Sequence, residues 1–476
     1  MLPYIVRIAI NHIVYEVTPK SWTVMFNLQG YFYVLTYHTK LANLKLYFGL
    51  AKEADMYSIK RHIEPIIERR AKNSKAIALT GPRQVGKSTL FRHLFNNVRQ
   101  VTFDDDLLLS QAMDDVGMFM LNNPAPLMID EVQKCESIFN RLKIELDNTD
   151  AYGNYFLTGS QKLQLIEGIS ESMAGRISLM VMEGLSLREI YEVDYNKHFI
   201  PSDDYLSSRE GKMKKYKGDI WEIIHRGSYP ELYANPEKEW VDFYQSYVKT
   251  YLERDVNHLL KAKNRLTFVK FMTSVAARTG QIINYANIAS EIEVSEVTVK
   301  EWISILERSG LIYILKPYTP SVLNRAIKTP KLYFRDTGLC SYLTRWLTPE
   351  TLKNGAMSGA MFETFVVNEI LKSYSNEGLD YDFDVFFYNG KDKKRIKTNG
   401  HEEEVDGEID LIIHENGILY PIEIKMSTSP KTNMASEFDV LDGIPEKKRG
   451  TGAIICMIDR KLYLRENFVA LLLLYL

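Results

Sequence analysis

Cysteine is scarce in this chain of 476 residues. The three cysteines, Cys135, Cys340 and Cys456, lie far apart and form no CxxC or CxxH spacing. This pattern excludes a disulfide scaffold and a zinc finger, and it is typical of a reducing compartment. We therefore expect a cytoplasmic protein.

An excess of charge of one sign is also absent. The chain has 59 Lys plus Arg against 61 Asp plus Glu, which gives a net charge of -2. The overall charge therefore does not support nucleic-acid binding, and any basic surface would have to be local. Hydrophobic residues make up 45% and charged residues 25%, which excludes wholesale disorder and a multi-span membrane protein. Because a domain typically has roughly 100 to 200 residues, we expect three domains.

Acidic residues are almost missing from the start of the chain, where Glu16 stands alone before residue 50. Residues 21–39 contain no Lys, Arg, Asp or Glu, but Asn, Gln, Gly and Thr dilute them, so we expect no membrane span. Residues 31–37 alternate as in a strand, which allows an added β-hairpin. We favour another interpretation, in which residues 1–55 precede the biological start at Met56.

A glycine-rich loop with the pattern G-x-x-x-x-G-K-[ST] follows an apolar strand pattern and precedes a helical one. The loop consists of Gly81, Pro82, Arg83, Gln84, Val85, Gly86, Lys87, Ser88 and Thr89. Its glycines let backbone N–H groups point at phosphate oxygens, and the helix N-terminus adds partial positive charge. Lys87 would reach the β- and γ-phosphates, and the Ser88 hydroxyl would complete a Mg²⁺ shell. We predict that these nine residues bind ATP.

Two more strand patterns end in polar residues. Residues 126–131 form an apolar run that ends in Asp130 and Glu131. Asp130 would hold Mg²⁺ through water, and Glu131 would polarise the attacking water. A third strand ends near Thr158, which would sense the γ-phosphate, although a structural turn explains this residue almost as well.

Arg176 precedes a further strand pattern. At this place it would lie on the domain surface rather than in its own nucleotide pocket. This suits an arginine finger that is offered to a neighbouring subunit, and a solvated surface arginine is the alternative. The finger interpretation predicts a homo-oligomer.

The middle of the chain is less specific. Residues 191–217 are polar with little periodicity and predict a long loop or linker. Residues 283–317 read as helix, turn, helix and strand, the order of a winged helix whose second helix often enters the DNA major groove. The polar face of that helix mixes two basic residues with three acidic ones: Lys300, Arg308, Glu296, Glu301 and Glu307. This mixture favours a structural or subunit-packing role over DNA binding.

Residues 408–425 read as two strands joined by Asn416 and Gly417, the strongest short hairpin signal. With these two residues as the loop, Glu415 pairs with Ile418. The register then places four charged residues on one face, with Asp410 opposite Glu423 and Glu408 opposite Lys425.

Opposed carboxylates destabilise a plain hairpin, and a bound divalent cation would compensate for the repulsion. Asp410 and Glu423 would then bind Mg²⁺, while Lys425 would orient the attacking water or stabilise the phosphorane charge. This is the geometry of a metal-dependent phosphodiester hydrolase. A salt-bridged solvent face on an edge hairpin is the competing interpretation.

Taken together, these motifs resemble a prokaryotic AAA-type P-loop ATPase family. Its members carry a C-terminal domain of unknown function that resembles a restriction-endonuclease (PD-(D/E)xK-like) fold. The resemblance is carried by residues 81–88, 129–133, 157–161, 174–176, 184–189, 227–231, 251–256 and 334–339. It begins near residue 57 and implies ATP and Mg²⁺ as cofactors. It also implies that Glu363 projects towards the hairpin, and it leaves open that the endonuclease-like fold serves only to bind proteins.

One segment departs from the family pattern. Residues 391–404 are polar and look like an insertion, for which we expect a flexible loop. Glu404-Val405-Asp406 repeats the Glu408-Ile409-Asp410 pattern, but the hairpin register favours Asp410 as the site residue.

The predicted fold is α/β, with a P-loop AAA-type core followed by a helical and winged-helix region and an α+β endonuclease-like domain. The predicted boundaries are 1–55, 56–190, 191–350 and 351–476. We expect an ATPase that couples hydrolysis to a conformational change acting on DNA or a protein partner. The alternatives are a slow regulatory nucleotide switch and a metal-dependent DNA nuclease loaded by its ATPase.

Overall fold

The computed structural model describes residues 59–159, 175–214, 218–251, 265–319, 329–396, 402–444 and 446–476, together with five strands in the first 52 residues. Side chains are described neither in these five strands nor in residues 391–396 and 402–406. The chain divides into two compact units, Met1–Ser58 and Ile59–Leu476. Of the helices in the described part, none is long and apolar enough to cross a membrane.

The first unit is one antiparallel sheet of consecutive strands. Its strands are β1 (Val6–Ile10), β2 (Ile13–Thr18), β3 (Ser21–Leu28), β4 (Tyr31–His38) and β5 (Gly49–Lys52). The strand predicted from the alternation at residues 31–37 is therefore confirmed, although it belongs to five strands rather than to a single hairpin. A start at Met56 stays a prediction.

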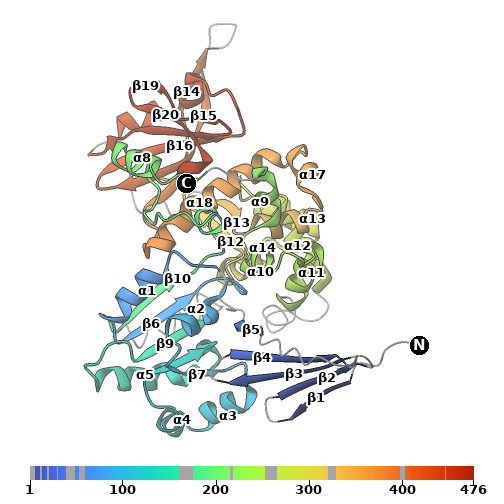
Figure 1. Ribbon diagram of the computed structural model, residues 1–476. Helices are drawn as coiled ribbons and strands as arrows, with labels where there is room; N and C mark the ends of the chain where they lie inside the picture. The colour runs from blue at the N-terminus through green and yellow to red at the C-terminus, as the bar shows by residue number, and fades with distance from the viewer. Residues whose placement is uncertain are drawn as a thin grey trace. The chain divides into compact units, whose positions relative to one another are not determined.

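The second unit begins with a parallel sheet in the order β10-β6-β9-β8-β7 (Figure 1). The strands are β6 (Ala76–Thr80), β7 (Arg99–Thr102), β8 (Leu127–Asp130), β9 (Tyr155–Gly159) and β10 (Ile177–Val181). The helices are α1 (Glu64–Ala71), α2 (Lys87–Leu94), α3 (Asp106–Asp114), α4 (Val116–Asn122) and α5 (Ser137–Asp147). Every residue of β6 and β9 is buried, as expected for central strands covered on both faces.

A helical region with a small sheet follows. Its helices are α7 (Leu187–Ile190), α8 (Asp203–Glu210), α9 (Ile220–Arg226), α10 (Pro230–Ala234), α11 (Trp240–Tyr251), α12 (Arg265–Ala276), α13 (Tyr285–Ile292), α14 (Glu296–Arg308), α16 (Thr337–Leu343) and α17 (Pro349–Lys353). Its antiparallel sheet has the order β11 (Gln281–Ile282), β13 (Lys331–Phe334) and β12 (Ile312–Leu315). The predicted helix, turn, helix and strand are thus present as α13, α14 and β12.

The loop predicted at residues 191–217 is wrong in part, because α8 lies within it. The Tyr205 side chain is buried and donates to the backbone oxygen of Tyr475 at 2.8 Å. Apolar residues are too few here to show a helical period. The helix is stabilised by packing against the distant C-terminus, which no local pattern reports.

The last part combines α18 (Ser358–Glu377) with a mixed sheet in the order β14-β15-β16-β18-β20-β19. The strands are β14 (Val385–Ile396), β15 (Glu402–Glu415), β16 (Ile418–Lys425), β17 (Lys448–Arg449), which pairs with β16, β18 (Gly452–Cys456), β19 (Leu462–Arg465) and β20 (Phe468–Leu472). The observed architecture confirms the predicted α/β class, with a parallel core, a helical region and a mixed C-terminal sheet.

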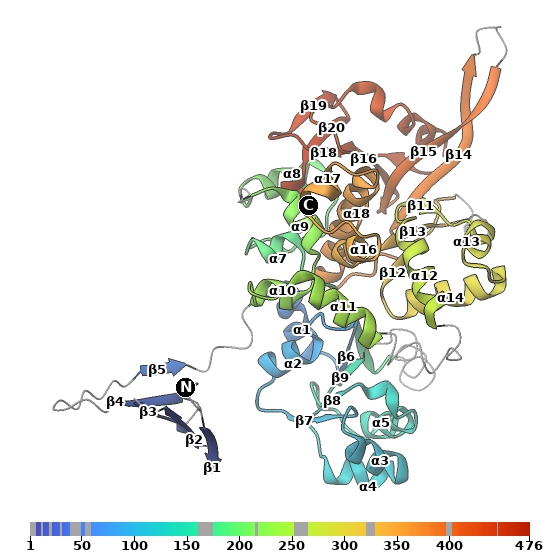
Figure 2. The ribbon, with the colours of Figure 1, turned by 90° about the vertical axis from the view of Figure 1, so that its right-hand side faces the viewer.

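The flexible loop predicted at residues 391–404 is wrong for the part that the structure describes. β14 and β15 continue through it as a paired ribbon, which projects from the sheet in Figure 2. The backbone register pairs Lys394 with Glu404 and Arg395 with Glu403. Polarity alone suggested a loop, whereas the backbone forms two paired strands.

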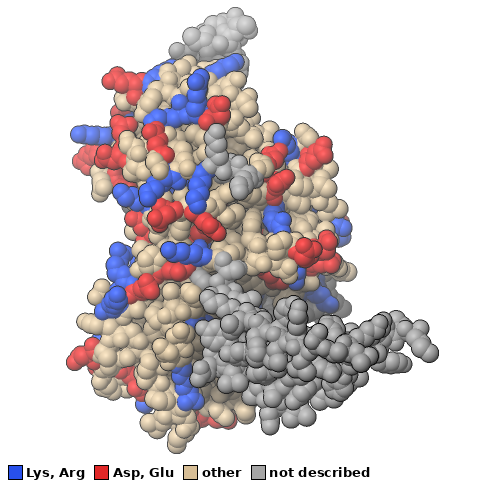
Figure 3. Space-filling model, viewed as in Figure 1, with Lys and Arg blue, Asp and Glu red and all other residues tan. Residues whose placement is uncertain are grey.

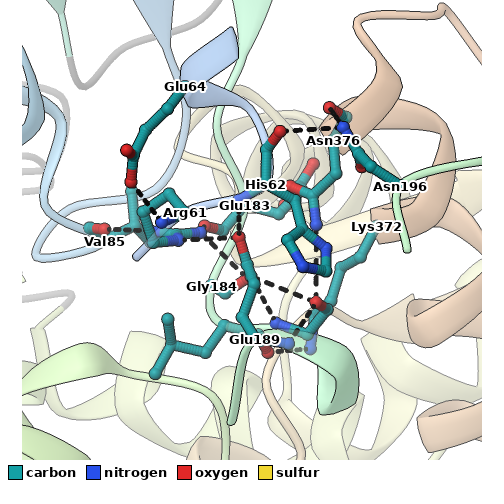
Figure 4. A network of polar contacts seen from close by, with 12 residues as sticks. Arg61, His62, Glu64, Val85, Glu183, Gly184, Glu189, Asn196, Lys372 and Asn376 are labelled. Carbon is teal, nitrogen blue, oxygen red and sulfur yellow. Dashed lines mark hydrogen bonds and ion pairs between the residues drawn. The ribbon is translucent and has the colours of Figure 1, made fainter. Parts of the chain in front are cut away.

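A buried network around Arg61 connects the parts of the second unit (Figure 4). The Arg61 guanidinium donates to the backbone oxygens of Val85 at 2.9 Å and Glu183 at 2.7 Å, and it pairs with the Glu189 carboxylate at 3.0 Å. Although burial opposes ionisation, Arg61 and His62 lower the pKa of Glu189 to about 2. This pKa lies below that of an unfolded glutamate. The stabilising contribution is therefore present above pH 5 and is lost as the pH falls towards 2.

We predict that Arg61→Met lowers the free energy of unfolding by about 3 to 5 kcal/mol, because it leaves the Glu189 carboxylate buried without its cation. Lys353→Met is the matched control. It removes an ion pair with Asp219 in which both side chains are more than 40% exposed, and it should cost less than about 1 kcal/mol. Urea unfolding of the two variants measures the difference, and equal losses would contradict the role assigned to Arg61.

Candidate functional site

The predicted phosphate-binding loop lies between β6 and α2. Gly81 has φ +143°, and a Cβ atom built there would lie 2.0 Å from the backbone oxygen of Met182, so only glycine fits. Lys87 is 7% exposed, and its Nζ donates to the backbone oxygens of Gly81 at 2.9 Å and Pro82 at 2.7 Å. The lysine therefore lies within the loop that its side chain would serve, and phosphate oxygens would replace the two carbonyls as its acceptors.

Three polar groups predicted from separate motifs meet at the carboxyl edge of the sheet. The Ser88 hydroxyl donates to Asp130 Oδ1 at 2.7 Å, and the Thr158 hydroxyl donates to the same oxygen. β6, β8 and β9 are adjacent parallel strands, so their carboxyl ends must lie at one edge. Hydroxyl and carboxylate oxygens are the ligands that Mg²⁺ prefers, and this set fits the ion.

Glu131 directly follows β8 and has a left-handed backbone, with φ 53° and ψ 41°. Such a conformation is uncommon for a residue with a side chain. The Glu131 carboxylate accepts a hydrogen bond from the Gln133 amide, which holds it beside Asp130. Glu131 is thus placed at the same edge as the phosphate loop.

Arg176 lies at the opposite edge of this sheet. Its neighbour Ile177 pairs with Ala76, the first residue of β6, whereas the phosphate loop follows the last residue of β6. A five-residue strand is about 16 Å long, so Arg176 is well separated from its own loop. Its guanidinium forms an ion pair with Asp147 on the protein surface.

A pocket of about 340 Å³ adjoins the phosphate loop, within the usual size of small-molecule sites. It is lined by the loop residues Gly81 and Pro82 and by residues of the middle region, among them Arg308, Tyr313 and Arg335. A Cβ atom at Gly310 would lie 3.1 Å from Pro82 Cγ, so the turn after α14 directly contacts the loop. No sequence motif indicated this contact.

The C-terminal hairpin has the predicted register, with Glu415 paired to Ile418. The described ladder ends at Leu411 and Ile422, one step before Asp410 and Glu423. At that step Asp410 Oδ2 accepts the backbone N–H of Ile424 at 2.8 Å. Lys425 Nζ lies 2.6 Å from Glu423 Oε1 and 3.5 Å from Asp410 Oδ2.

Two residues of β13 join this cluster, and the sequence analysis missed both. The Tyr333 hydroxyl donates to Glu363 Oε1 at 2.7 Å. Lys331 Nζ lies 3.5 Å from Glu363 Oε1 and 3.9 Å from Asp410 Oδ1. Lys331 and Tyr333 alternate in the strand and thus share one face, but only the fold shows which domain that face meets.

The carboxylates of this cluster are buried and close to one another. Burial and the charge of Asp410 raise the pKa of Glu363 to about 7 and that of Glu423 to about 8. Burial opposes the charged form of Lys425, but Asp410 and Glu423 outweigh it and raise the pKa of this lysine. Two lysines, together with the raised pKa values of Glu363 and Glu423, therefore offset the repulsion for which the hairpin pattern suggested a divalent cation. The described residues contain no group of three or more His, Cys, Asp or Glu side chains positioned to hold a metal ion.

Comparison with known families assigns three segments. Residues 73–191 match the family model described as AAA domain, and residues 217–350 and 358–475 match two domains of unknown function, DUF8612 and DUF4143. The chain therefore carries an AAA-type P-loop ATPase domain, which implies ATP binding and hydrolysis.

Relatives of similar length are distant. Uncharacterized proteins of Mycobacterium bovis and Mycobacterium tuberculosis are each 24% identical over 402 residues, covering 84% of this chain and 81% of theirs. The Walker-type ATPase of Pyrococcus abyssi is 14% identical, with a TM-score of 0.36 over 59% of this chain and 94% of its own. RuvB of Thermotoga maritima is also 14% identical, with a TM-score of 0.28 over 54% and 89%. Because both TM-scores are low, these two structures add nothing to the match of residues 73–191 with the AAA domain.

We predict that Lys87→Ala abolishes ATP binding. Lys87 is buried within the loop rather than exposed, so the variant should also lose up to about 3 kcal/mol of stability. Lys134→Ala is the control, because it removes a partly exposed lysine of the same domain that pairs with Asp104. Equilibrium binding of a fluorescent ATP analogue measures the effect, and normal affinity in folded Lys87→Ala would refute the assignment of this loop.

Proposed function

We propose that the protein is a Mg²⁺-dependent ATPase that uses hydrolysis to change the arrangement of its later regions and so acts on DNA or a protein partner. The observation that carries the proposal is the meeting of Ser88, Thr158 and Asp130 beside the Lys87 loop. Two independent strand ends and one loop thus supply the groups that phosphoryl transfer needs.

Each residue has a distinct role in this reaction. The backbone N–H groups of residues 81–89 and the Lys87 ammonium bind and orient the phosphates. Ser88 and Asp130 would hold Mg²⁺, which supplies positive charge to the phosphate oxygens when it is bound. Glu131 orients the attacking water and takes its proton, and Thr158 senses the γ-phosphate through its bond to Asp130.

Contacts beyond the ATPase sheet support coupling to the later regions. Arg335, which follows β13, forms an ion pair with Glu183, and Glu183 lies just after the strand that flanks β6. The Arg335 guanidinium also donates to the Tyr381 hydroxyl at 2.6 Å, at the beginning of the C-terminal sheet. A change at the loop would therefore reach both later regions through packed side chains rather than through a linker.

The distribution of charge on the protein surface does not favour DNA over a protein as the partner. On the face shown in Figure 3, Lys and Arg side chains are interspersed with Asp and Glu over the described residues. We propose that α12, β11, α13, α14, β12 and β13 form a winged helix that packs within the protein. Turnover that rises when DNA is added would distinguish a DNA-directed motor from a slow regulatory switch.

A cytoplasmic location remains part of the proposal, since Cys135, Cys340 and Cys456 are buried free thiols.

A second candidate function rests on the C-terminal cluster. The proposal is supported by Lys425, whose Nζ contacts both Asp410 and Glu423, and by Lys331, whose Nζ lies within 4 Å of Glu363 and Asp410. We propose that this endonuclease-like site cleaves DNA only when a divalent metal ion is bound. Incubating plasmid DNA with the protein and Mn²⁺, with and without ATP, tests this function separately from ATP turnover.

We predict that Glu131→Gln still binds ATP but turns it over about 100-fold more slowly or worse, because the amide keeps the shape and removes the general base. The control is Glu136→Gln, which makes the same change at an exposed glutamate five residues further along the chain. Phosphate release under saturating ATP measures turnover. Unchanged release by Glu131→Gln would assign the base to another residue.

For a homo-oligomer, we predict that Arg176→Ala loses turnover while its own loop still binds ATP. Mixing it with Lys87→Ala should restore part of the activity, because one mixed interface joins an intact loop with an intact arginine. Activity is measured across mixing ratios, and subunit exchange is verified by mass photometry. If exchange occurs without recovery, Arg176 does not act between subunits.

A further inference from the structure

Lys331 belongs to β13 of the middle region, yet its ammonium lies inside the C-terminal cluster. The side chain is 4% exposed. Its Nζ forms an ion pair with Glu408 and lies within 4 Å of Glu363 Oε1 and Asp410 Oδ1, at 3.5 and 3.9 Å. Three carboxylates from α18 and β15 thus surround one cation that neither element supplies.

The Lys331 ammonium supplies positive charge to Glu363, Glu408 and Asp410 without a metal ion. Burying an ammonium is costly unless carboxylates surround it, so the position of Lys331 is determined by charge rather than by packing alone. Mg²⁺, Mn²⁺ and Ca²⁺ need oxygen ligands at about 2.0 to 2.6 Å, closer than the ammonium holds Glu363 and Asp410. The absence of a metal-binding group among the described residues agrees with carboxylates spread around Lys331.

We propose that Lys331 is a built-in counter-ion that occupies the cation position of the C-terminal site, so that a divalent metal ion binds there only when β13 withdraws this lysine. The inference rests on the second function proposed above. It assigns to the middle region the control of metal access to the C-terminal domain.

The second lysine of the cluster has a different role. Lys425 lies on β16 next to Glu423, and its side chain is 44% exposed. It therefore belongs to the C-terminal domain itself and stays there when β13 moves. Withdrawal of Lys331 would leave Lys425 as the one ammonium among the described residues beside Glu363, Glu408, Asp410 and Glu423, and a divalent cation would then stabilise their charged forms.

The residue that follows β13, Arg335, indicates how the ATPase part would control the withdrawal of Lys331. Arg335 pairs with Glu183 of the ATPase part and lines the pocket beside Gly81 and Pro82. Lys331 and Arg335 are four residues apart in one extended segment, so a displacement at the pocket is transmitted along the backbone to the C-terminal site. Nucleotide binding and metal binding would thus be linked through one strand.

The test is calorimetric titration of Mn²⁺ into the full chain without nucleotide. If Lys331 is withdrawn in less than about a tenth of the molecules, Lys331→Met should bind Mn²⁺ about tenfold more tightly or better than wild type. Lys331→Arg should stay like wild type because it keeps the cation, and Lys300→Met controls for loss of a lysine elsewhere. Adding Asp410→Asn to Lys331→Met should remove the binding that Lys331→Met gained.

Two results would overturn the inference and are distinguishable. If Lys331→Met is folded and binds Mn²⁺ no more tightly than wild type, while Asp410→Asn weakens binding, the metal site stands and Lys331 does not compete for it. If neither wild type nor Lys331→Met binds Mn²⁺, both the inference and the proposed metal-dependent function fail. ATP turnover is measured separately and is unaffected by either result.

Amine acylation of the wild-type chain gives a readout that does not depend on the folding of a variant. Where the wild type binds Mn²⁺, saturating metal should raise the labelling of Lys331 several-fold, while the labelling of Lys300 stays constant. Mass spectrometry of the digested protein measures both sites. Constant labelling of Lys331 with Mn²⁺ bound would show that metal and lysine do not exclude each other.

Discussion

The buried ion pair of Arg61 and Glu189 is the constraint on which the rest of the second unit depends. Arg61 binds the backbone of the phosphate loop at Val85 and of the chain after β10 at Glu183. Glu189 also accepts the backbone N–H of Ser186 and so caps α7. One pair thus fixes the loop and the beginning of the next region. Because each partner would be a buried charge without the other, neither element can move alone at low cost.

β13 connects the two candidate sites in a similar way. At one end Lys331 lies among the C-terminal carboxylates, and at the other end Arg335 pairs with Glu183 beside the loop that Arg61 also binds. The strand itself is buried along its whole length. A strand held by ion pairs at both ends could transmit a displacement from one site to the other, and the proposed coupling through the middle region depends on these two pairs.

Local patterns predicted the parts of the fold that local chemistry determines. The glycine loop, the ends of β8 and β9, and the Asn416-Gly417 turn each depend on residues that are close in sequence, and the parallel sheet then had to bring Ser88, Asp130 and Thr158 to one edge. α8 and the ribbon of β14 and β15 escaped prediction because α8 packs against a distant C-terminus and the ribbon depends on the pairing of two strands. Both segments are as polar as a loop, so their composition alone does not distinguish them from one.

The C-terminal site shows most clearly where such reasoning ends. The predicted register is confirmed from Glu415 and Ile418 to Leu411 and Ile422, and repulsion between Asp410 and Glu423 was the reason to expect a divalent cation beside them. The sequence of the hairpin could not show that a lysine of another region supplies positive charge there, since Lys331 and Asp410 are brought together only by packing between domains. A buried carboxylate cluster is satisfied equally well by an ammonium or by a metal ion. Under the proposal made above, Lys331 and a divalent metal ion compete for this site, and the position of β13 determines which one it holds.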